Sequence, residues 1–195
     1  MAPHCSEESI VNAVDRDRNE CLRAVRRTRQ FREFDTRPVA PEDLDALVDA
    51  ARWSGSSSNT QPWRFIVIRD PATIRTIHEL GAPQTRGLAT APAAIAIVMP
   101  SDTKRAVQDA YDEGRVAERI LIGAGMLDLG AGVSWILSKI RDEVGALLGL
   151  PPDRMVRTMV QVGHPTAAAL APKSEPGKAR LPREEVVFQE RWPGA

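Results

Sequence analysis

Small polar side chains are concentrated in one loop, where a predicted helix ends and a predicted strand begins. Residues 54–61 read Ser-Gly-Ser-Ser-Ser-Asn-Thr-Gln, between Trp53 and Pro62-Trp63. Side chains this small let a ligand approach the backbone, and their hydroxyl and amide groups both donate and accept hydrogen bonds. Such a loop could bind the polar edge of a flat heteroaromatic ligand. Because Ser, Gly and Asn are also common turn residues, an ordinary helix-to-strand turn explains the composition equally well.

A second candidate site is a segment in which arginines alternate with phenylalanines. Five arginines occur between residues 23 and 32, and Phe31 and Phe34 flank the last of them. If the phenylalanines anchor the segment, some guanidinium groups can face a ligand, and their planar fork suits a phosphate. A solvated, cationic helix end would give the same pattern. Further along the chain, Lys178 and Arg180 would share one face of an extended segment.

The composition is that of one globular domain without an electrostatic preference for a partner. The chain has 195 residues, of which 26 are basic and 26 acidic, so neither nucleic acid nor an anionic membrane is an expected partner. The N-terminus lacks the regions typical of a signal peptide, and no apolar run approaches the roughly 20 residues of a membrane span. Cys5 and Cys21 both lie near the N-terminus, which argues against a disulfide framework. We therefore expect a reduced, cytoplasmic protein.

The titratable side chains do not form a recognisable catalytic or metal site. His4, His78 and His164 are far apart in the sequence, and isolated histidines of this kind are usually structural or exposed. Acidic pairs such as Glu184 and Glu185 lack the spacing of metal ligands. We therefore predict no metal ligand and no catalytic nucleophile or general base.

Apolar periodicity predicts a chain in which helices and strands alternate. The continuous apolar run over residues 93–99 predicts a fully buried strand. The glycines at 130 and 132 are interpreted as the end of a long helix, and the proline-rich tail from residue 166 has no helical pattern. Helices are expected over residues 7–28, 41–52, 71–80, 109–129 and 140–149, and strands over 64–69, 93–99, 133–137 and 155–162.

The alternation of elements favours an α/β fold with a parallel sheet. A parallel sheet that binds a dinucleotide would carry a Gly-rich turn between a strand and a helix. The only candidate glycines, Gly123 and Gly125, lie inside a helical pattern, and Asp128 stands where a third glycine would be needed. The pattern therefore does not predict a dinucleotide fingerprint, and these glycines are better explained by close helix packing.

Four motifs, taken together, resemble the nitroreductase family of flavin enzymes. They are Arg29-x-x-Arg32-x-Phe34-x-x-x-Pro38-Val39, Ser56-Ser57-x-Asn59-x-Gln61-Pro62-Trp63, Leu129-Gly130-Ala131-Gly132 with Trp135, and Lys178-x-Arg180-Leu181-Pro182. They occur in the family's order and span about residues 25–192. The resemblance implies an α+β fold, in which helices flank a mostly antiparallel central sheet, and this replaces the parallel expectation. It also implies an intertwined homodimer with FMN between the subunits. Residues 1–20 would be an N-terminal extension and the start of the first helix, and 21–195 a single FMN-binding domain.

The resemblance also implies which residues bind FMN. The N-terminal segment would hold the phosphate, the ribityl chain and the ring edge, and the tail would close on the phosphate from the other side. The serine loop would come from the partner chain, and a cation near the pyrimidine edge would stabilise the anionic reduced flavin. Residues 135–138, at the end of the third strand, would lie against the opposite face or edge of the ring. The implied cofactor-binding residues are Arg29, Gln30, Arg32, Ser56, Ser57, Asn59, Gln84, Arg86, Trp135, Leu137, Lys178 and Arg180.

This chain departs from the family pattern at three places. Thr28 stands where many relatives have a phosphate-binding arginine, and Arg26 or Arg27 could substitute for it. Gly55 replaces a common proline, which should loosen the serine loop. Little sequence is inserted between residues 100 and 115, where relatives often place a helical lid over the substrate.

The function implied is that of an FMN-dependent oxidoreductase. NAD(P)H would reduce the flavin, and a planar acceptor such as a nitroaromatic or a quinone would then take its place, in a ping-pong mechanism. Three alternatives remain open from the sequence. One is a flavin-destructase or dehalogenase-like branch, another is a flavin-binding or storage module without turnover, and the third is an oxidoreductase that uses a deazaflavin.

Overall fold

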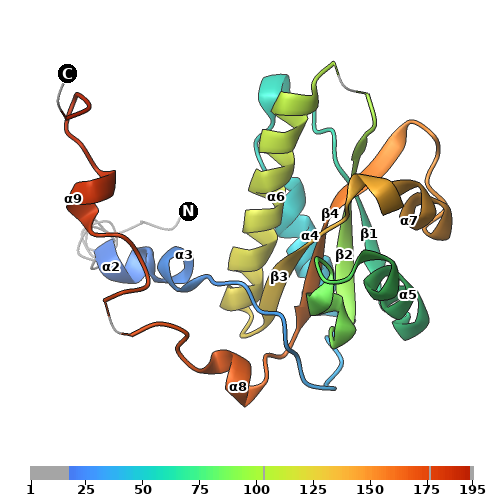
Figure 1. Ribbon diagram of the computed structural model, residues 1–195, viewed down its shortest axis with the longest axis horizontal. Helices are drawn as coiled ribbons and strands as arrows, with labels where there is room; N and C mark the ends of the chain where they lie inside the picture. Colours follow the sequence, from blue (N-terminus) through green and yellow to red (C-terminus); the bar gives the residue numbers. More distant parts are fainter. Residues whose placement is uncertain (1–17, 103, 176, 194–195) are drawn as a thin grey trace, which may run out of the picture.

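Four antiparallel strands form the centre of the molecule, and helices cover both faces of the sheet (Figure 1). The structure is a computed structural model and describes residues 18–102, 104–175 and 177–193. The strands are β1 (Arg64–Ile68), β2 (Ala93–Pro100), β3 (Gly130–Trp135) and β4 (Arg154–Gly163), in the order β1-β2-β4-β3. All three strand pairs are antiparallel. The α+β expectation is therefore confirmed, and the expectation of a parallel sheet is wrong.

The position of β4 explains why the alternation of helices and strands wrongly predicted a parallel sheet. Both β2 and β3 are antiparallel to β4, so they run in the same direction as each other. The helix between them, α6 (Ala106–Met126), is about 32 Å long and crosses the sheet as a parallel crossover would. β4 then enters between the two strands it connects, and both of its neighbours become antiparallel.

The remaining helices are shorter than α6, and several differ from the expected ranges. The expected helix 7–28 is described only from residue 18, where it forms two short helices, and its earlier part lies outside the described residues. The tail contains two short helices where none was expected. The described helices other than α6 are α2 (Arg18–Cys21), α3 (Arg23–Arg27), α4 (Pro41–Arg52), α5 (Pro71–Gly81), α7 (Arg141–Leu147), α8 (Ala167–Leu170) and α9 (Arg183–Val186). The 3₁₀ turns are η1 (Ser57–Asn59), η2 (Arg86–Ala89) and η3 (Ser138–Ile140).

Helix α6 ends earlier than its periodicity suggested. Asp128 adopts a left-handed conformation with φ of 56°, and the Leu129 amide donates to the Ala124 carbonyl over 2.8 Å. This bond from the second residue after the cap to the last full turn is a Schellman C-cap, in which glycine is the usual left-handed residue. Gly130 and Gly132 therefore belong to β3, and their interpretation as the end of the helix is wrong.

The core lies on both sides of β2, which is buried along almost its whole length as expected. Ile95 and Ile97 face α4 and α6, and the alternating residues Ala96 and Val98 face α5 and α7. A strand covered on both faces reads as a continuous apolar run. Within the described residues, no helix is both long and apolar enough to cross a bilayer.

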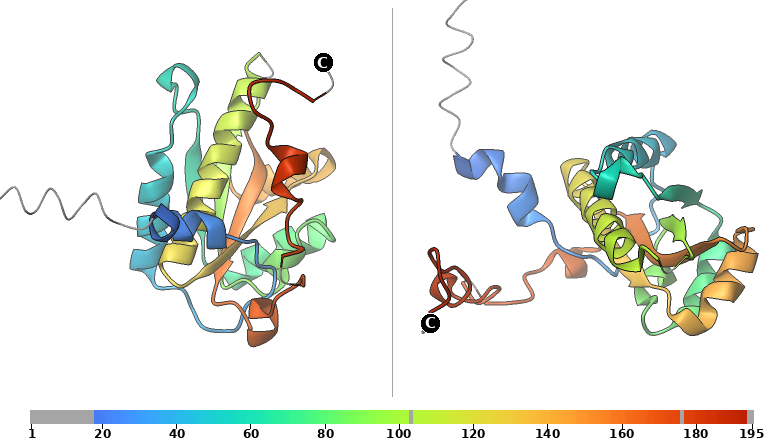
Figure 2. Two further views of the ribbon diagram at one scale, coloured as in Figure 1. Left: turned by 90° about the vertical axis from the view of Figure 1, so that its left-hand side faces the viewer. Right: turned by 90° about the horizontal axis from the view of Figure 1, so that it is seen from above.

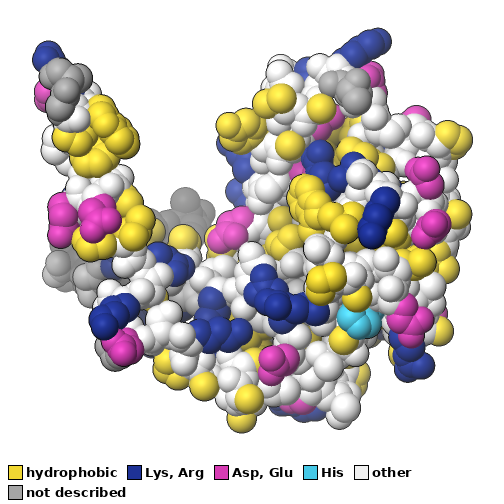
Figure 3. Space-filling model, in the orientation of Figure 1, with side chains coloured by type: hydrophobic (Ala, Val, Ile, Leu, Met, Phe, Trp, Pro, Cys, Tyr) yellow, Lys and Arg dark blue, Asp and Glu magenta, His cyan; other side chains and the backbone are white. Residues whose placement is uncertain are grey.

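Both ends of the described chain project from this body on the same side. Figure 2 shows α2 and the tail that carries α9 leaving the body separately. Figure 3 shows an open space between the tail and the side of the body formed by α6. The tail residues from 171 to 187 are exposed wherever they are described.

Candidate functional site

The N-terminal segment, residues 29–34, lies along the outer edge of β3. The Phe31 amide donates to the Ala131 carbonyl over 2.8 Å, and the Phe31 carbonyl accepts from Nε2 of Gln161 over 3.2 Å. A side chain at Gly132 would collide with that same carbonyl and with the Gln161 amide. Gly132 is therefore needed because the two backbones approach closely.

Gln30 connects Arg32 to the strand. Its Oε1 accepts from the Val133 amide and from a terminal nitrogen of Arg32, each over 3.2 Å. Gln30 is exposed, and Arg32 is half-buried. The pair therefore presents a cation and an amide side by side on the surface next to β3.

Arg29 is engaged with the end of α8 instead of facing open solvent. Its guanidinium donates to the carbonyls of Ala169, Leu170 and Ala171 over 2.6–3.3 Å. It also lies over the Phe31 ring, with 4.7 Å between the guanidinium carbon and the ring centroid. Cations near the last turn of a helix commonly satisfy its free carbonyls in this way. Arg29 thus ties the start of the tail to the N-terminal segment.

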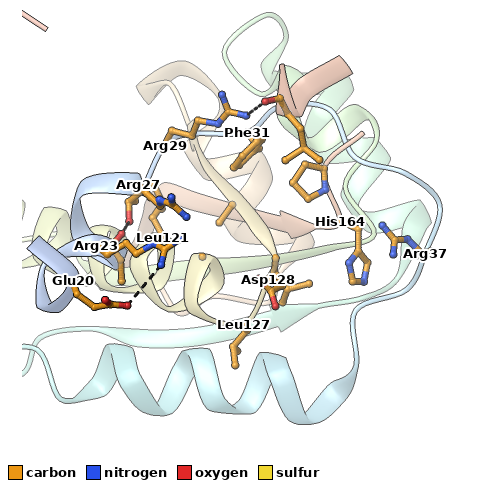
Figure 4. Close-up of a pocket in the computed structure, with 17 residues that line it drawn as sticks. Glu20, Arg23, Arg27, Arg29, Phe31, Arg37, Leu121, Leu127, Asp128 and His164 are labelled. Atoms are coloured by element: carbon orange, nitrogen blue, oxygen red, sulfur yellow. Dashed lines mark hydrogen bonds and ion pairs between the residues drawn. The ribbon is translucent and has the colours of Figure 1, made fainter. Parts of the chain in front are cut away.

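A cationic groove of about 730 Å³ opens beside this segment, between α3 and the end of α6 (Figure 4). Arg23 and Arg27 line it from α3, and Leu121 and Leu129 contribute apolar surface. Thr28 also lines it, but its hydroxyl donates to the Ala24 carbonyl over 2.8 Å. Arg27 therefore supplies a cation next to the position where Thr28 departs from the family pattern.

His164 and Arg37 lie at the other end of the same groove. Arg37 forms an ion pair with Asp35 over 2.7 Å, and this contact holds the pKa of the Asp35 carboxyl below its usual value. Figure 3 shows lysine and arginine side chains gathered on the face that the N-terminal segment crosses. An anionic group would meet several cations on this side of the molecule.

The serine loop lies at the opposite edge of the sheet, before β1. Ser58, Asn59 and Gln61 have left-handed backbone conformations, with φ of 53°, 52° and 46°. The Ser56 hydroxyl accepts from the Gln61 amide over 2.9 Å, which closes the loop. Ser58, Asn59 and Gln61 are exposed. The carbonyl of Gly55 accepts from Arg115 over 3.2 Å, so the loop is restrained at the glycine that was expected to loosen it.

Trp135 ends β3 with an exposed indole. The Arg157 guanidinium lies 6.0 Å from the Trp135 ring centroid. The β2–β4 register shifts between Ile97 and Val98, so that Arg157 has no partner in that ladder. Bulges of this kind re-aim side chains. Leu137, by contrast, packs against the α5–α7 core, so any contact it makes with a cofactor would come from its backbone.

Gln84 and Arg86 are exposed on the segment that leads into η2. The next residue, Gly87, has no room for a side chain because Gln161 packs against it. Gln161 is fully buried and also accepts from the Ser134 hydroxyl over 2.9 Å. One buried amide therefore joins η2, which begins at Arg86, to β3 and to the N-terminal segment.

Lys178 and Arg180 belong to the tail, which projects away from the body of the molecule (Figure 2). Lys178 pairs with Glu175, and Arg180 donates to the Ala179 carbonyl over 2.8 Å. The structure therefore divides the predicted site into three parts. One part lies around β3, another is the serine loop at the opposite edge, and the third is the tail.

Sequence reasoning missed three buried polar residues and the half-buried Arg157 around these parts. Gln161 is one of the three, and the others are Asp112 and Glu113, which together with Arg157 hold the serine loop and the end of β3. Asp112 and Glu113 precede Val116, Ala117 and Ile120 at helical spacing, so they fall on the apolar stripe of α6. Acidic residues on a buried stripe were the signal that could have identified them.

The donor set fits FMN. The arginines on the N-terminal segment and on α3 suit a phosphate, the amides and hydroxyls suit a ribityl chain and a polar ring edge, and the exposed indole of Trp135 suits a flat ring. His78, by contrast, contacts the Thr85 carbonyl over 3.2 Å between α5 and η2, which is a structural position. Among the described residues, no group of three or more His, Cys, Asp or Glu side chains could hold a metal ion.

Comparisons with known proteins identify the family. The nitroreductase family model matches residues 24–164. A relative from Archaeoglobus fulgidus, provisionally named NADH dehydrogenase/NAD(P)H nitroreductase, is 32% identical over 75% of this chain and 86% of its own length. The FMN reductase [NAD(P)H] of Bacillus subtilis is 26% identical over 89% of this chain and 75% of its own length. The chain therefore belongs to the nitroreductase family, and the sequence-based assignment to these oxidoreductases is confirmed.

The fold agrees with solved structures. The solved structure of nitroreductase A from Vibrio parahaemolyticus superimposes with a TM-score of 0.75. The superposition covers 90% of this chain and 77% of the nitroreductase A chain, at 20% sequence identity. At this identity the likeness supports the fold alone.

Proposed function

We propose that the protein is an FMN-dependent oxidoreductase that takes reducing equivalents from NAD(P)H and passes them to a planar acceptor such as a nitroaromatic or a quinone. The observation that carries this proposal is the cation and amide pair Arg32 and Gln30, which is bonded to the Val133 amide on β3, two positions before the exposed Trp135. Membership of the nitroreductase family and the names of its relatives support the same chemistry.

The side chains around β3 would bind and orient FMN. Arg32 would hold the phosphate together with Arg27 or Arg29, and Gln30 would keep Arg32 in place through its bond to the Val133 amide. Gln84 and Arg86 would face the pyrimidine edge. The chemistry that FMN supplies when bound is electron transfer from a nicotinamide to a second substrate, so no protein nucleophile is required.

The complete site would form only in a homodimer. The serine loop and the β3 group lie on opposite edges of one sheet, and the tail carries Lys178 and Arg180 away from both. Large apolar side chains are exposed on α6 and on the tail, as expected for surfaces that a second copy covers. They are Val107, Tyr111, Met126, Leu181 and Trp192.

The decisive experiment is spectroscopic. The purified protein should be yellow, or should become yellow with added FMN, and anaerobic NADH or NADPH should bleach the flavin absorbance. Protein that neither contains nor binds FMN would contradict the proposal. Bound flavin that both nicotinamides leave oxidised would instead indicate a flavin-binding module without turnover. Binding of a deazaflavin but not of FMN would indicate an oxidoreductase that uses a deazaflavin.

A mixing experiment tests whether the site is shared between chains. Asn59→Ala alters the serine loop and Arg32→Ala alters the phosphate site, so each homodimer should lose activity. If the two residues serve one site from different chains, a mixed dimer has one intact site. Statistical mixing should then restore about one quarter of the wild-type activity. If the mixed subunits exchange but regain no activity, Asn59 and Arg32 would have to serve a site from one and the same chain.

A further inference from the structure

The serine loop has a backbone conformation that needs support from outside the loop. Its three left-handed residues, Ser58, Asn59 and Gln61, all carry side chains, and all three are exposed. Non-glycine residues keep such conformations only where neighbouring structure holds them. The loop would have to be rigid to present its hydroxyl and amide groups to a ligand in one orientation.

That support comes from one face of α6 together with the residue before it. Asp112 accepts from the Ser57 amide through both carboxylate oxygens, over 3.0 and 3.2 Å. Arg115 donates to the Gly55 carbonyl, and Arg119 donates to the Trp53 carbonyl over 2.9 Å. Arg105 donates to the Ser57 carbonyl over 3.4 Å. These side chains are spaced by seven, three and four positions, which places them on one face of a helix.

Asp112 differs from the three arginines in burial. It is 2% exposed, whereas the side chains of Arg105 and Arg115 are 44% and 62% exposed. Solvent screens the exposed bonds and competes for them. A buried carboxylate has no such alternative, so its hydrogen bond to the Ser57 amide is the strongest restraint on the loop. Arg115 also pairs with Asp112 over 3.6 Å, which partly balances the buried charge.

We propose that Asp112 is a positioning residue for the serine loop. By holding the Ser57 amide, its carboxylate sets where η1 begins, and it thereby orients Ser56, Ser57 and Asn59. The inference rests on the proposed flavin site, because those are the side chains that would contact the cofactor. Asp112 itself lies behind the loop and acts through the backbone.

Helix α6 provides a matched control. Asp109 lies one turn earlier and is also buried, with 6% exposure, but it pairs with Arg105 over 4.0 Å and makes no hydrogen bond to the loop backbone. Asp109→Ala removes a buried carboxylate from the same helix but keeps both bonds from the Ser57 amide to Asp112, and it touches the loop only through Arg105, whose exposed side chain donates to the Ser57 carbonyl over 3.4 Å. It therefore separates a general effect on stability from an effect on the loop.

The test uses two measurements on each variant. Hydrogen exchange of the amides in residues 54–63, measured on the protein without cofactor, reports the loop. Fluorescence titration with FMN reports the dissociation constant. Asp112→Ala should accelerate exchange of the loop and raise the FMN dissociation constant, each about tenfold, because a bond to a charged acceptor is lost. Asp112→Asn, which retains an acceptor oxygen, should stay within about threefold of wild type in both measurements.

The control and a longer side chain complete the design. Asp109→Ala should leave loop exchange and FMN affinity near wild type, even where urea unfolding shows a loss of stability. Asp112→Glu keeps the charge but moves the carboxylate, so it should also accelerate exchange of the loop, and it decides the question if Asp112→Ala does not fold. Unchanged loop exchange in a folded Asp112→Ala or Asp112→Glu variant would overturn the inference, as would equal effects of Asp109→Ala. Wild-type protein that binds no FMN would contradict the proposed function, while the exchange measurement would still decide the role of Asp112.

Discussion

Glu113 and Arg157 form a buried ion pair between α6 and the irregular part of β4. One carboxylate oxygen of Glu113 accepts from Nε of Arg157 over 2.9 Å and also from a terminal nitrogen of the same guanidinium. The two side chains are 3% and 15% exposed. The guanidinium also faces Trp135, so this pair links α6 to the end of β3. Adjacent carboxylates on one helix thus hold two different parts of the predicted site, since Asp112 bonds to the serine loop.

Removing Glu113 should strongly destabilise the fold. Glu113→Ala leaves the Arg157 guanidinium largely buried without its partner, and breaking such a pair costs about 3 kcal/mol. Urea unfolding measures the loss. Glu118→Ala on the exposed side of α6 is the control and should change the free energy of unfolding little. A Glu113→Ala protein as stable as this control would show that the ion pair contributes nothing.

Adding one methyl group at Gly132 should disrupt the contact between the N-terminal segment and β3. The new side chain would collide with the Phe31 carbonyl and the Gln161 amide, and overpacking of this kind costs about 1–3 kcal/mol. Gly145→Ala in α7 is the matched control, because its side chain would come no closer than 3.9 Å to Leu150 and alanine favours the helix. Thermal unfolding should therefore shift in opposite directions for the two variants. A Gly132→Ala protein with an unchanged Tm would mean that the segment moves freely.

The stability contributed by Asp70 should depend on pH. Asp70 caps α5 by accepting from the Thr73 hydroxyl and from the amides of Thr73 and Ala72, and these bonds hold its pKa below the usual 3.8. A carboxyl whose pKa is depressed in the folded state stabilises that state above its unfolded pKa and loses the effect as pH falls through the folded value. Asp70→Ala should therefore lower the Tm by a few degrees at pH 7, and the difference should shrink below pH 3.8. A constant difference in Tm between pH 7 and pH 3 would contradict this explanation.

Alanine substitutions of Arg29 and Arg32 should have different effects, one on the tail and the other on FMN binding. Arg32→Ala should weaken FMN binding about tenfold or more through loss of a charge-assisted contact, and it should leave the tail undisturbed. Arg29→Ala removes the donors to the α8 carbonyls, so hydrogen exchange in residues 167–173 should accelerate in the protein without cofactor. Titration with FMN and exchange mass spectrometry measure the two effects. If Arg29→Ala left the tail unchanged, its contacts with α8 would have no role in anchoring it.

Local signals in the sequence predicted most of the elements. Apolar periodicity predicted a helix over 71–80, close to the bounds of α5, and the uninterrupted apolar run predicted β2 as a fully buried strand. These features depend on residues near one another in the chain. The family motifs identified the fold because they combine several such local features in a fixed order.

Features that depend on distant partners could not be predicted in the same way. The direction of the sheet depends on β4, which enters between β2 and β3 from more than fifty positions after β2. The roles of Asp112 and Arg157 depend on what faces α6 and β4 in three dimensions. The end of α6 was missed for a local reason, because Asp128 takes the conformation that glycine usually provides.

The late position of β4 has a consequence for biosynthesis. Until residue 163 has left the ribosome, β2 and β3 lack the strand that joins them, and both present unpaired backbone edges. The apolar sides of β2 are then also without the Val160 and Met159 that complete the two cores. Incomplete chains that stop before β4 are therefore prone to associate with one another, and the sheet is complete only after β4 has emerged.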